Sequence, residues 1–257
     1  MGVENIIFLI IFIAASLLFT KNLKRIIRNI KLGKDIDRSD NPVLRWKTMA
    51  RVALGQSKMV VRPIAGVLHI LVYVGFVIIN IEVIEIIIDG IFGTHRVLSF
   101  MGSFYNFLIG SFEVLAFLVL VACVILYFRR NFVKIQRFWK PEMKGWPSSD
   151  ANLILIFEVL LMSAFLFMDA ADYLLQQKGF YHHAGAFPIS TMLTPILAGL
   201  SEGSLLLIER FCWWFHIIGI LGFLNYLVVS KHLHILLAFP NTYYSNLNPK
   251  GEFTNMA

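Results

Sequence analysis

The chain has 257 residues, of which 58% are hydrophobic and only 15% are charged. This composition, with a mean hydropathy of +0.71, excludes an ordinary soluble domain and is typical of an integral membrane protein. The formal net charge of +7 does not call for a nucleic-acid partner, because the basic residues gather in segments between long apolar runs.

Five apolar runs are long enough to cross a bilayer, which takes roughly 20 helical residues. The first, "IIFLIIFIAASLLFT", lacks a basic leader and a cleavage motif, so we expect a retained helix and not a signal peptide. The sequence therefore predicts an all-α, five-helix membrane bundle over residues 1–235, followed by a tail over 236–257. The other four predicted spans are Arg62 to Ile88, Phe104 to Phe128, Leu153 to Leu175 and Leu205 to Val229.

Lysine and arginine are concentrated in two connecting segments, Lys21 to Lys58 and Arg129 to Lys144. The positive-inside rule places such segments in the cytoplasm, and the first also has helically spaced apolar residues that suit a helix lying on the membrane surface. The segment "QQKGFYHHAGAFPISTMLTPILAGLSEGS" has little positive charge and is expected outside, with a short helix near Met192 to Leu200. The N-terminus is then outside and the C-terminus inside.

Histidines stand at both ends of the last apolar run, "HIIGILGFLNYLVVSKHLH". On one continuous helix the spacing from His216 to His234 is about five full turns, so both would leave the same face about 27 Å apart, and His232 would be rotated about 160° away from His216. His69 lies at a depth similar to that of His234. Two neutral imidazoles at one depth can ligate a haem iron from both sides; the alternative is a histidine that bonds to a neighbouring helix or touches lipid headgroups.

The residues around these histidines resemble segments of two known families. The stretch "HIIGILGFLNYLVVSKHLHILLAFPN" resembles the last helix of the gamma-subunit type of respiratory nitrate reductase, a five-helix dihaem cytochrome b. "SKHLHILLAFPN" followed by "NPKGEF" is similar to the membrane part of heterodisulfide-reductase-like iron–sulfur proteins, including electron-transfer-flavoprotein:menaquinone oxidoreductases. The resemblance implies that His69 and His234 bind an inner haem b, and that His216 is one ligand of an outer haem.

The sequence departs from that pattern at one position. The nitrate reductase family carries a second histidine further along helix two, where Ile79 stands here. Either another residue completes an outer haem site, with His95, His182 and His183 as the outer-side histidines, or the chain holds a single haem. In the second case His216 would serve a quinone headgroup.

Several ionisable residues lie in or near the predicted spans, where they are rare and usually functional. Glu113 is the best candidate for a proton relay, with Glu158 and Asp169 also deep. Arg210 has three candidate partners, a haem propionate, Glu209 and a lipid headgroup. The aromatic run "FCWWF" suits an interfacial belt better than a quinone pocket, and a short acidic stripe at the outer end of helix two, formed by Glu82, Glu85 and Asp89, is consistent with a solvated helix end.

The predicted function is that of the membrane part of a quinone-linked oxidoreductase in a bacterial cytoplasmic membrane. One or two haem b groups would pass electrons between menaquinone and an iron–sulfur partner on the cytoplasmic side. Cys123 and Cys212 each stand alone in apolar runs, so the chain has no cysteines for a cluster of its own, and the cluster would belong to a partner subunit or a further domain. The alternative is a proton or ion transporter or channel that uses intramembrane histidines and acids. A purely structural anchor is a third possibility, disfavoured because it has no use for these histidines.

Overall fold

The computed structural model describes residues 2–133, 135–248 and 251. All regular secondary structure in these residues is helical, and five helices are long and apolar enough to cross a membrane. The prediction of an all-α chain with five spans is confirmed, and the observed helices extend beyond most of the predicted bounds. The five spanning helices are α1 (Val3–Ile30), α3 (Pro63–Phe92), α4 (Ser103–Asn131), α5 (Trp146–Gln177) and α7 (Glu202–Leu227).

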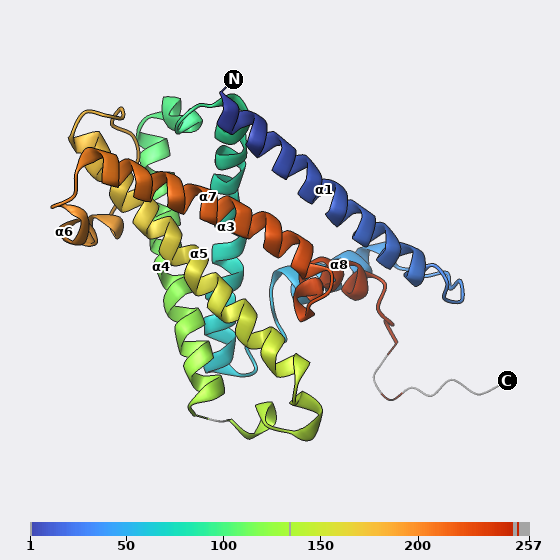
Figure 1. The fold of residues 1–257 in the computed structure, drawn as a ribbon. Helices are drawn as coiled ribbons and strands as arrows, with labels where there is room; N and C mark the ends of the chain where they lie inside the picture. The colour runs from blue at the N-terminus through green and yellow to red at the C-terminus, as the bar shows by residue number, and fades with distance from the viewer. Residues whose placement is uncertain (1, 134, 249–250, 252–257) are drawn as a thin grey trace.

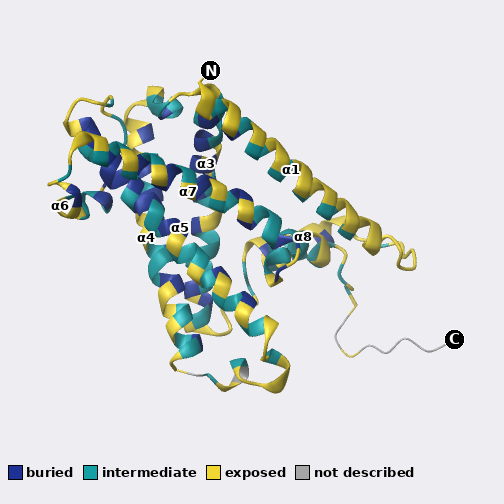
Figure 2. Cartoon of the chain, viewed as in Figure 1, coloured by how far each residue is buried: buried dark blue, intermediate teal, exposed yellow. Residues whose placement is uncertain are grey.

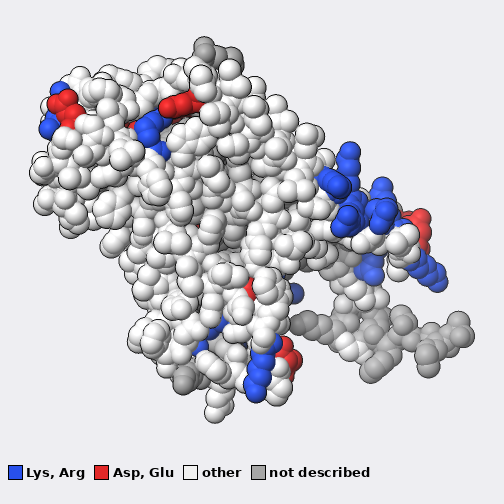
Figure 3. Space-filling model, in the orientation of Figure 1, with Lys and Arg blue, Asp and Glu red and all other residues white. Residues whose placement is uncertain are grey.

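Four of these helices form the body of the bundle (Figure 1): α4 packs between α3 and α5, and α7 packs on α5. Helix α1 contacts α3 and α7 over its first half, as far as Ala15, whose carbonyl accepts from the Asn225 side chain of α7, and its second half extends away from the body of the bundle. We call the end where α1, α4 and α7 begin the Arg96 end, and the opposite end the His234 end. Figure 3 shows a broad band almost free of charged atoms between these ends, as expected of a surface that faces hydrocarbon.

Helix α1 is held mainly at its start, by Asn5 and Phe8. The Asn5 side chain donates a hydrogen bond of 2.9 Å to the carbonyl of Gly90, and the Phe8 ring is 1% exposed. A Cβ at Gly90 would lie 2.6 Å from that ring, so glycine is what lets the two helices meet here. Most of the remaining length of α1 is exposed (Figure 2).

Small residues also allow close packing inside the bundle. A Cβ at Gly75 of α3 would clash with the Val119 side chain of α4, and one at Gly219 of α7 would lie 2.6 Å from Leu161 of α5. Interfaces between membrane helices favour such residues, since contact between helices depends on packing and not on the exclusion of water.

Short helices complete the two ends of the bundle. At the His234 end, α2 (Pro42–Met49) continues as a π-helical turn (Ala50–Leu54), which confirms a helix in the first basic segment, and α8 (His234–Tyr243) packs on α2. The buried Arg45 joins α2 and α8 by donating to the carbonyls of Tyr243 and Ser245. The short helix expected near Met192 is present as α6 (Thr194–Leu197). The remaining turns are 3-10 helices over Val97–Met101, Gln136–Phe138, Pro141–Met143, Ser190–Met192 and Lys231–Leu233.

The predicted tail is more ordered near its start than a simple linker. Its boundary at residues 235/236 falls inside α8. Residues 249–250 and 252–257, which belong to the same predicted tail, lie outside the residues that the structure describes.

Helix α7 ends at Leu227, short of His234. Ser230 is extended, and the backbone N–H of Lys231 donates to the buried carboxylate of Asp150 at 3.1 Å, a group that also accepts the Tyr226 hydroxyl. This contact with α5 competes with continuation of the helix. The expectation that His216 and His234 share one helix face 27 Å apart is therefore wrong, and the rotation that set His232 aside does not apply.

Candidate functional site

Three histidines meet at the His234 end. His69 lies in the second turn of α3, His232 in the 3-10 turn after α7, and His234 at the start of α8. The rings of His232 and His234 are 5.5 Å apart between centroids, and α3 begins at the same end of the bundle, six residues before His69. The structure thus brings together His69 and His234, the pair proposed from the sequence, and adds His232 to them.

The hydrogen bonds of these rings decide which nitrogens are free. His234 Nδ1 lies 2.8 Å from the carbonyl oxygen of Lys231; because a carbonyl only accepts, this nitrogen carries a proton, and Nε2 is the ring nitrogen left for a ligand. A histidine that binds a metal commonly donates its other ring N–H to a carbonyl in this way. His69 Nδ1 and His232 Nδ1 are buried without a hydrogen-bond partner among the described residues. Burial lowers the pKa of His232 to about 4, so its ring is neutral near pH 7.

His216 lies alone in the middle of the bundle, 1% exposed. Its Nδ1 donates to the Leu161 carbonyl oxygen at 3.1 Å, which again leaves Nε2 as the acceptor. The ring lines a cavity of about 70 Å³ between α3, α4, α5 and α7, and the polar side chains that share the cavity are Asn80 and Glu158.

Ile79 lines this same cavity. The position where the nitrate reductase pattern has a histidine therefore faces His216 with an aliphatic side chain. Neither His95 nor His182 or His183 lines the cavity. His216 thus has a carboxyl and an amide group as polar neighbours, and the described residues do not assemble a second imidazole beside it.

Glu113 does not lie where a proton relay to His216 would have to lie, on the cavity beside that ring. It is completely buried, and its Oε2 accepts hydrogen bonds from the backbone N–H groups of Ile189 and Ser190 at 2.9 and 3.3 Å. It therefore fixes the segment after α5 onto α4. It does not line the His216 cavity, and its Oε1 is buried without a partner among the described residues.

Arg210 lies at the Arg96 end and pairs with Glu209, the nearest nitrogen and oxygen being 2.5 Å apart. Of its three candidate partners, Glu209 is the one observed. The run "FCWWF" is divided between two environments. Trp213 and Trp214 line a cavity at this end of the bundle, whereas Phe211 is 66% exposed and suits an interfacial belt.

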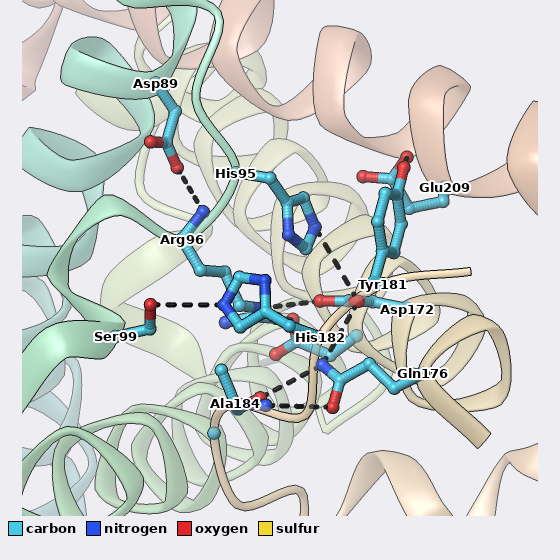
Figure 4. Close-up of polar contacts among 12 residues, drawn as sticks. Asp89, His95, Arg96, Ser99, Asp172, Gln176, Tyr181, His182, Ala184 and Glu209 are labelled. Atoms are coloured by element: carbon cyan, nitrogen blue, oxygen red, sulfur yellow. Dashed lines mark hydrogen bonds and ion pairs between the residues drawn. The ribbon is translucent and has the colours of Figure 1, made fainter. Parts of the chain in front are cut away.

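The Arg96 end holds a polar cluster that the sequence did not single out. Arg96 is 7% exposed, and its guanidinium group contacts Asp169 at 2.7 Å and Asp172 at 2.5 Å, both from α5 (Figure 4). Burial alone would lower the pKa of Arg96, but these two carboxylates outweigh it and raise the pKa. The sequence contained one signal for this cluster. Two acids, Asp169 and Asp172, are three positions apart and so lie on one face of an apolar span, and Arg96 in a connecting segment is a cation that could pair with them.

Residues around Arg96 extend this cluster. The His95 ring stacks on Tyr181 with centroids 3.9 Å apart and has its Nε2 3.7 Å from Asp172. Burial lowers the pKa of His95 to about 4, so this contact is not an ion pair near pH 7. Glu85 accepts from the Leu98 backbone and the hydroxyl of Tyr105.

The acidic stripe on α3 is therefore not a solvated helix end. Glu82 and Glu85 are 3% and 4% exposed. Asp89 accepts from the backbone of Arg96, as Figure 4 shows, and holds the turn after α3.

No group of three or more histidine, cysteine, aspartate or glutamate side chains in the described residues has an arrangement that could hold a metal ion. A haem takes only two axial ligands from the protein. His234 Nε2 and His69 Nδ1 lie at the same end of the bundle and have no hydrogen-bond partner among the described residues, so these two residues suit an axial pair.

The chain is similar to two curated proteins. One is named "Probable iron-sulfur-binding oxidoreductase FadF", from Bacillus subtilis, and is 26% identical over 247 residues, 96% of this chain and 33% of the relative. The other is named "EtfAB:quinone oxidoreductase", from Syntrophomonas wolfei, and is 28% identical over 227 residues, 85% of this chain and 30% of the relative. The chain thus spans about a third of the length of these relatives. No family model matches the chain, and no solved structure matches it.

Proposed function

We propose that this chain is a membrane electron-transfer domain that connects the quinone pool, with menaquinone as the quinone, to an iron–sulfur oxidoreductase partner through one haem b. The observation that carries the proposal is that His69 and His234, from distant parts of the chain, lie at the same end of the bundle, where His69 Nδ1 has no hydrogen-bond partner among the described residues and His234 uses only Nδ1, in a bond within its own turn. The names of the two relatives, an iron–sulfur-binding and a quinone oxidoreductase, support the same class of reaction.

His69 and His234 would be the axial ligands of this haem, which when bound supplies a one-electron carrier. The chain's own part is to orient the imidazoles. The Lys231 carbonyl does this for His234 by accepting its Nδ1 proton. His232 is a neighbour in the same cluster and is not assigned as a ligand, because the resemblance places the ligands at His69 and His234; its Nδ1, like that of His69, has no hydrogen-bond partner among the described residues.

His216 would serve the quinone. Its Nε2 is an acceptor in a cavity that also holds the carboxyl group of Glu158 and the amide of Asn80, and a quinone reaction needs hydrogen-bonding groups and a proton carrier. The cavity of about 70 Å³ would have to widen for a headgroup. Ile79 in this cavity supports the single-haem form of the proposal over an outer haem.

The iron–sulfur centre would lie outside these residues, because both cysteines are buried and separate. The basic segments at the His234 end support a cytoplasmic position for that end. Impermeant thiol labelling of single cysteines placed in Lys21 to Lys58 and Arg129 to Lys144 tests this topology: we expect no labelling from outside intact cells, and labelling there would overturn it.

The reduced-minus-oxidised optical spectrum of the purified protein tests the function. A b-type spectrum is the expected result, and its absence would rule out the haem. The fold does not support the transporter alternative. Transporters typically place their binding sites at broken helices, and each of the five long apolar helices here is continuous.

A further inference from the structure

A cavity of about 430 Å³ lies at the Arg96 end between α1, α3, α5 and α7. This volume holds on the order of ten water molecules or more. Its lining includes Gly2 and Glu4, which are near the surface, and the buried Glu82 and Glu209. Figure 3 shows acidic and basic atoms together near the N-terminal end of this face. The cavity therefore connects buried carboxyl groups with the surroundings of the bundle.

Carboxyl groups outnumber cations around this cavity. Among the described residues, the guanidinium groups that face the cluster are those of Arg96 and Arg210, and His95 is neutral near pH 7. The phenols of Tyr105 and Tyr181 also face it. The carboxyl groups come from every element packed there: Glu4 of α1, Glu82, Glu85 and Asp89 of α3, Glu113 of α4, Asp169 and Asp172 of α5, and Glu209 of α7.

Some of these carboxyl oxygens have no protein partner. Glu82 is 3% exposed and lines the cavity, and its Oε2 is buried without a hydrogen bond among the described residues. Glu113 Oε1 and Asp169 Oδ2 also lack a partner among the described residues, but the other oxygen of each is bonded, to the backbone of Ile189 and Ser190 and to Arg96 respectively. An unpaired buried carboxylate is costly, and the two guanidinium groups at this end pair with other carboxylates, Arg96 with Asp169 and Asp172 and Arg210 with Glu209. A proton on Glu82 would remove this uncompensated charge.

These groups also form a connected set. Glu82 interacts electrostatically with Asp169, Glu85 and Glu113. Helix α3 lines both cavities, with Asn80 and Val83 on the His216 cavity and Glu82 on the larger one. Glu82 is thus the chain neighbour of Val83, which lines the proposed quinone site, and itself lines a cavity that reaches the surface.

We infer that the carboxyl cluster around Glu82 is a proton-binding site, which exchanges protons with water at the Arg96 end and serves the quinone reaction at His216. Oxidation of one quinol to a quinone releases two electrons and two protons. The electrons would leave through the haem and the iron–sulfur partner, and the protons through this cluster to water; quinone reduction reverses both flows. The proton-binding part stands on the geometry alone, whereas the coupling to quinone rests on the proposed function.

Infrared spectroscopy of the full-length protein in nanodiscs tests the proton-binding part without haem, quinone or partner. We expect a C=O stretching band of protonated carboxyl groups at pH 7 that loses intensity in Glu82→Gln and is unchanged in the control Glu142→Gln, an exposed acid. Glu113→Gln is a second variant for the case that Glu82→Gln does not fold, because Glu113 is also buried, has an unpartnered Oε1 and makes no ion pair among the described residues. A missing band, or a band unaffected by substitution in the cluster, would overturn the site.

Proteoliposomes that contain the protein with its iron–sulfur partner test the coupling. We expect Glu82→Gln to slow quinone-linked electron transfer and proton exchange at the Arg96 side by at least about tenfold, with an unchanged haem spectrum. Unchanged rates in this variant would overturn the coupling. If the wild type itself shows no quinone activity, the proposed function fails, and the infrared result still decides whether the proton site exists.

Discussion

The two ends of the bundle use polar side chains in different ways. At the Arg96 end a buried guanidinium group joins α3, α4 and α5 through Asp169, Asp172 and Tyr105. At the His234 end the imidazoles have few protein contacts, and the bond from His234 to Lys231 comes from its own turn. Polar groups that satisfy one another hold a fold together, whereas groups left with free nitrogens indicate where a ligand binds.

The largest effect should come from Arg96→Met. This change leaves Asp169 and Asp172 buried without their cation, which typically costs about 3–5 kcal/mol. We expect a large drop in the thermal unfolding midpoint of the detergent-solubilised protein. Arg25→Met is the control, because its side chain is exposed and makes no ion pair among the described residues. Equal losses in the two variants would mean that Arg96 is not what joins the helices.

His216→Ala tests whether the quinone site is distinct from the haem site. Loss of a positioned hydrogen-bonding group that also handles protons typically costs about 10²-fold or more in rate. We expect quinone-linked electron transfer to fall by about that factor while the haem per chain stays the same. A loss of one of two haems in this variant would instead establish a dihaem protein, and an unchanged rate with unchanged haem would remove His216 from the mechanism.

Gly90→Ala tests how α1 closes the Arg96 end. The new methyl group would lie 2.6 Å from the Phe8 ring, and overpacking of this kind typically costs about 1–3 kcal/mol. Gly222→Ala in α7 is the control, since a methyl group there would have no heavy atom of another described residue outside its own turn within 4 Å. Thermal unfolding should show a loss only for Gly90→Ala; equal midpoints would indicate that α1 does not contribute to this end.

The smallest effect should be a pH dependence from His95. Burial lowers its pKa from 6.5 to about 4 in the folded protein. Between these values the unfolded chain binds a proton at His95 and the folded protein does not, so stability is full above about pH 6.5 and falls as the pH drops towards 4. The loss is on the order of 1–3 kcal/mol. His95→Gln should flatten the unfolding profile in this window, and the exposed His183→Gln should leave it unchanged; identical slopes for both would contradict the burial of His95.

The apolar pattern was enough to predict the fold class. Runs of continuous hydropathy gave five helices near their observed positions, because hydrocarbon thickness and backbone hydrogen bonding leave few alternatives. Hydropathy did not indicate where α7 ends, because "LVVSKHLHILLAF" stays largely apolar across the break. The cause is a contact with Asp150, which is far away in sequence and has no local pattern.

The candidate site was predictable in part. The pairing of His69 with His234 followed from depth and resemblance, and both lie at the same end. Neither source predicted the Arg96 cluster, because its members come from separate helices and connecting segments, and an isolated loop arginine resembles an ordinary surface residue. The imbalance between buried acids and nearby cations can be seen only when the helices are placed together.

The haem content of axial-ligand variants tests the central claim most directly. Haem per chain and the reduced-minus-oxidised spectrum would be measured for the wild type, His69→Ala, His234→Ala and His232→Ala, with His183→Ala as a surface control. We predict one haem per chain in the wild type, nearly complete loss in His69→Ala and His234→Ala, and retention in the other two. Haem lost only in His232→Ala, or retained in both His69→Ala and His234→Ala, would contradict the account.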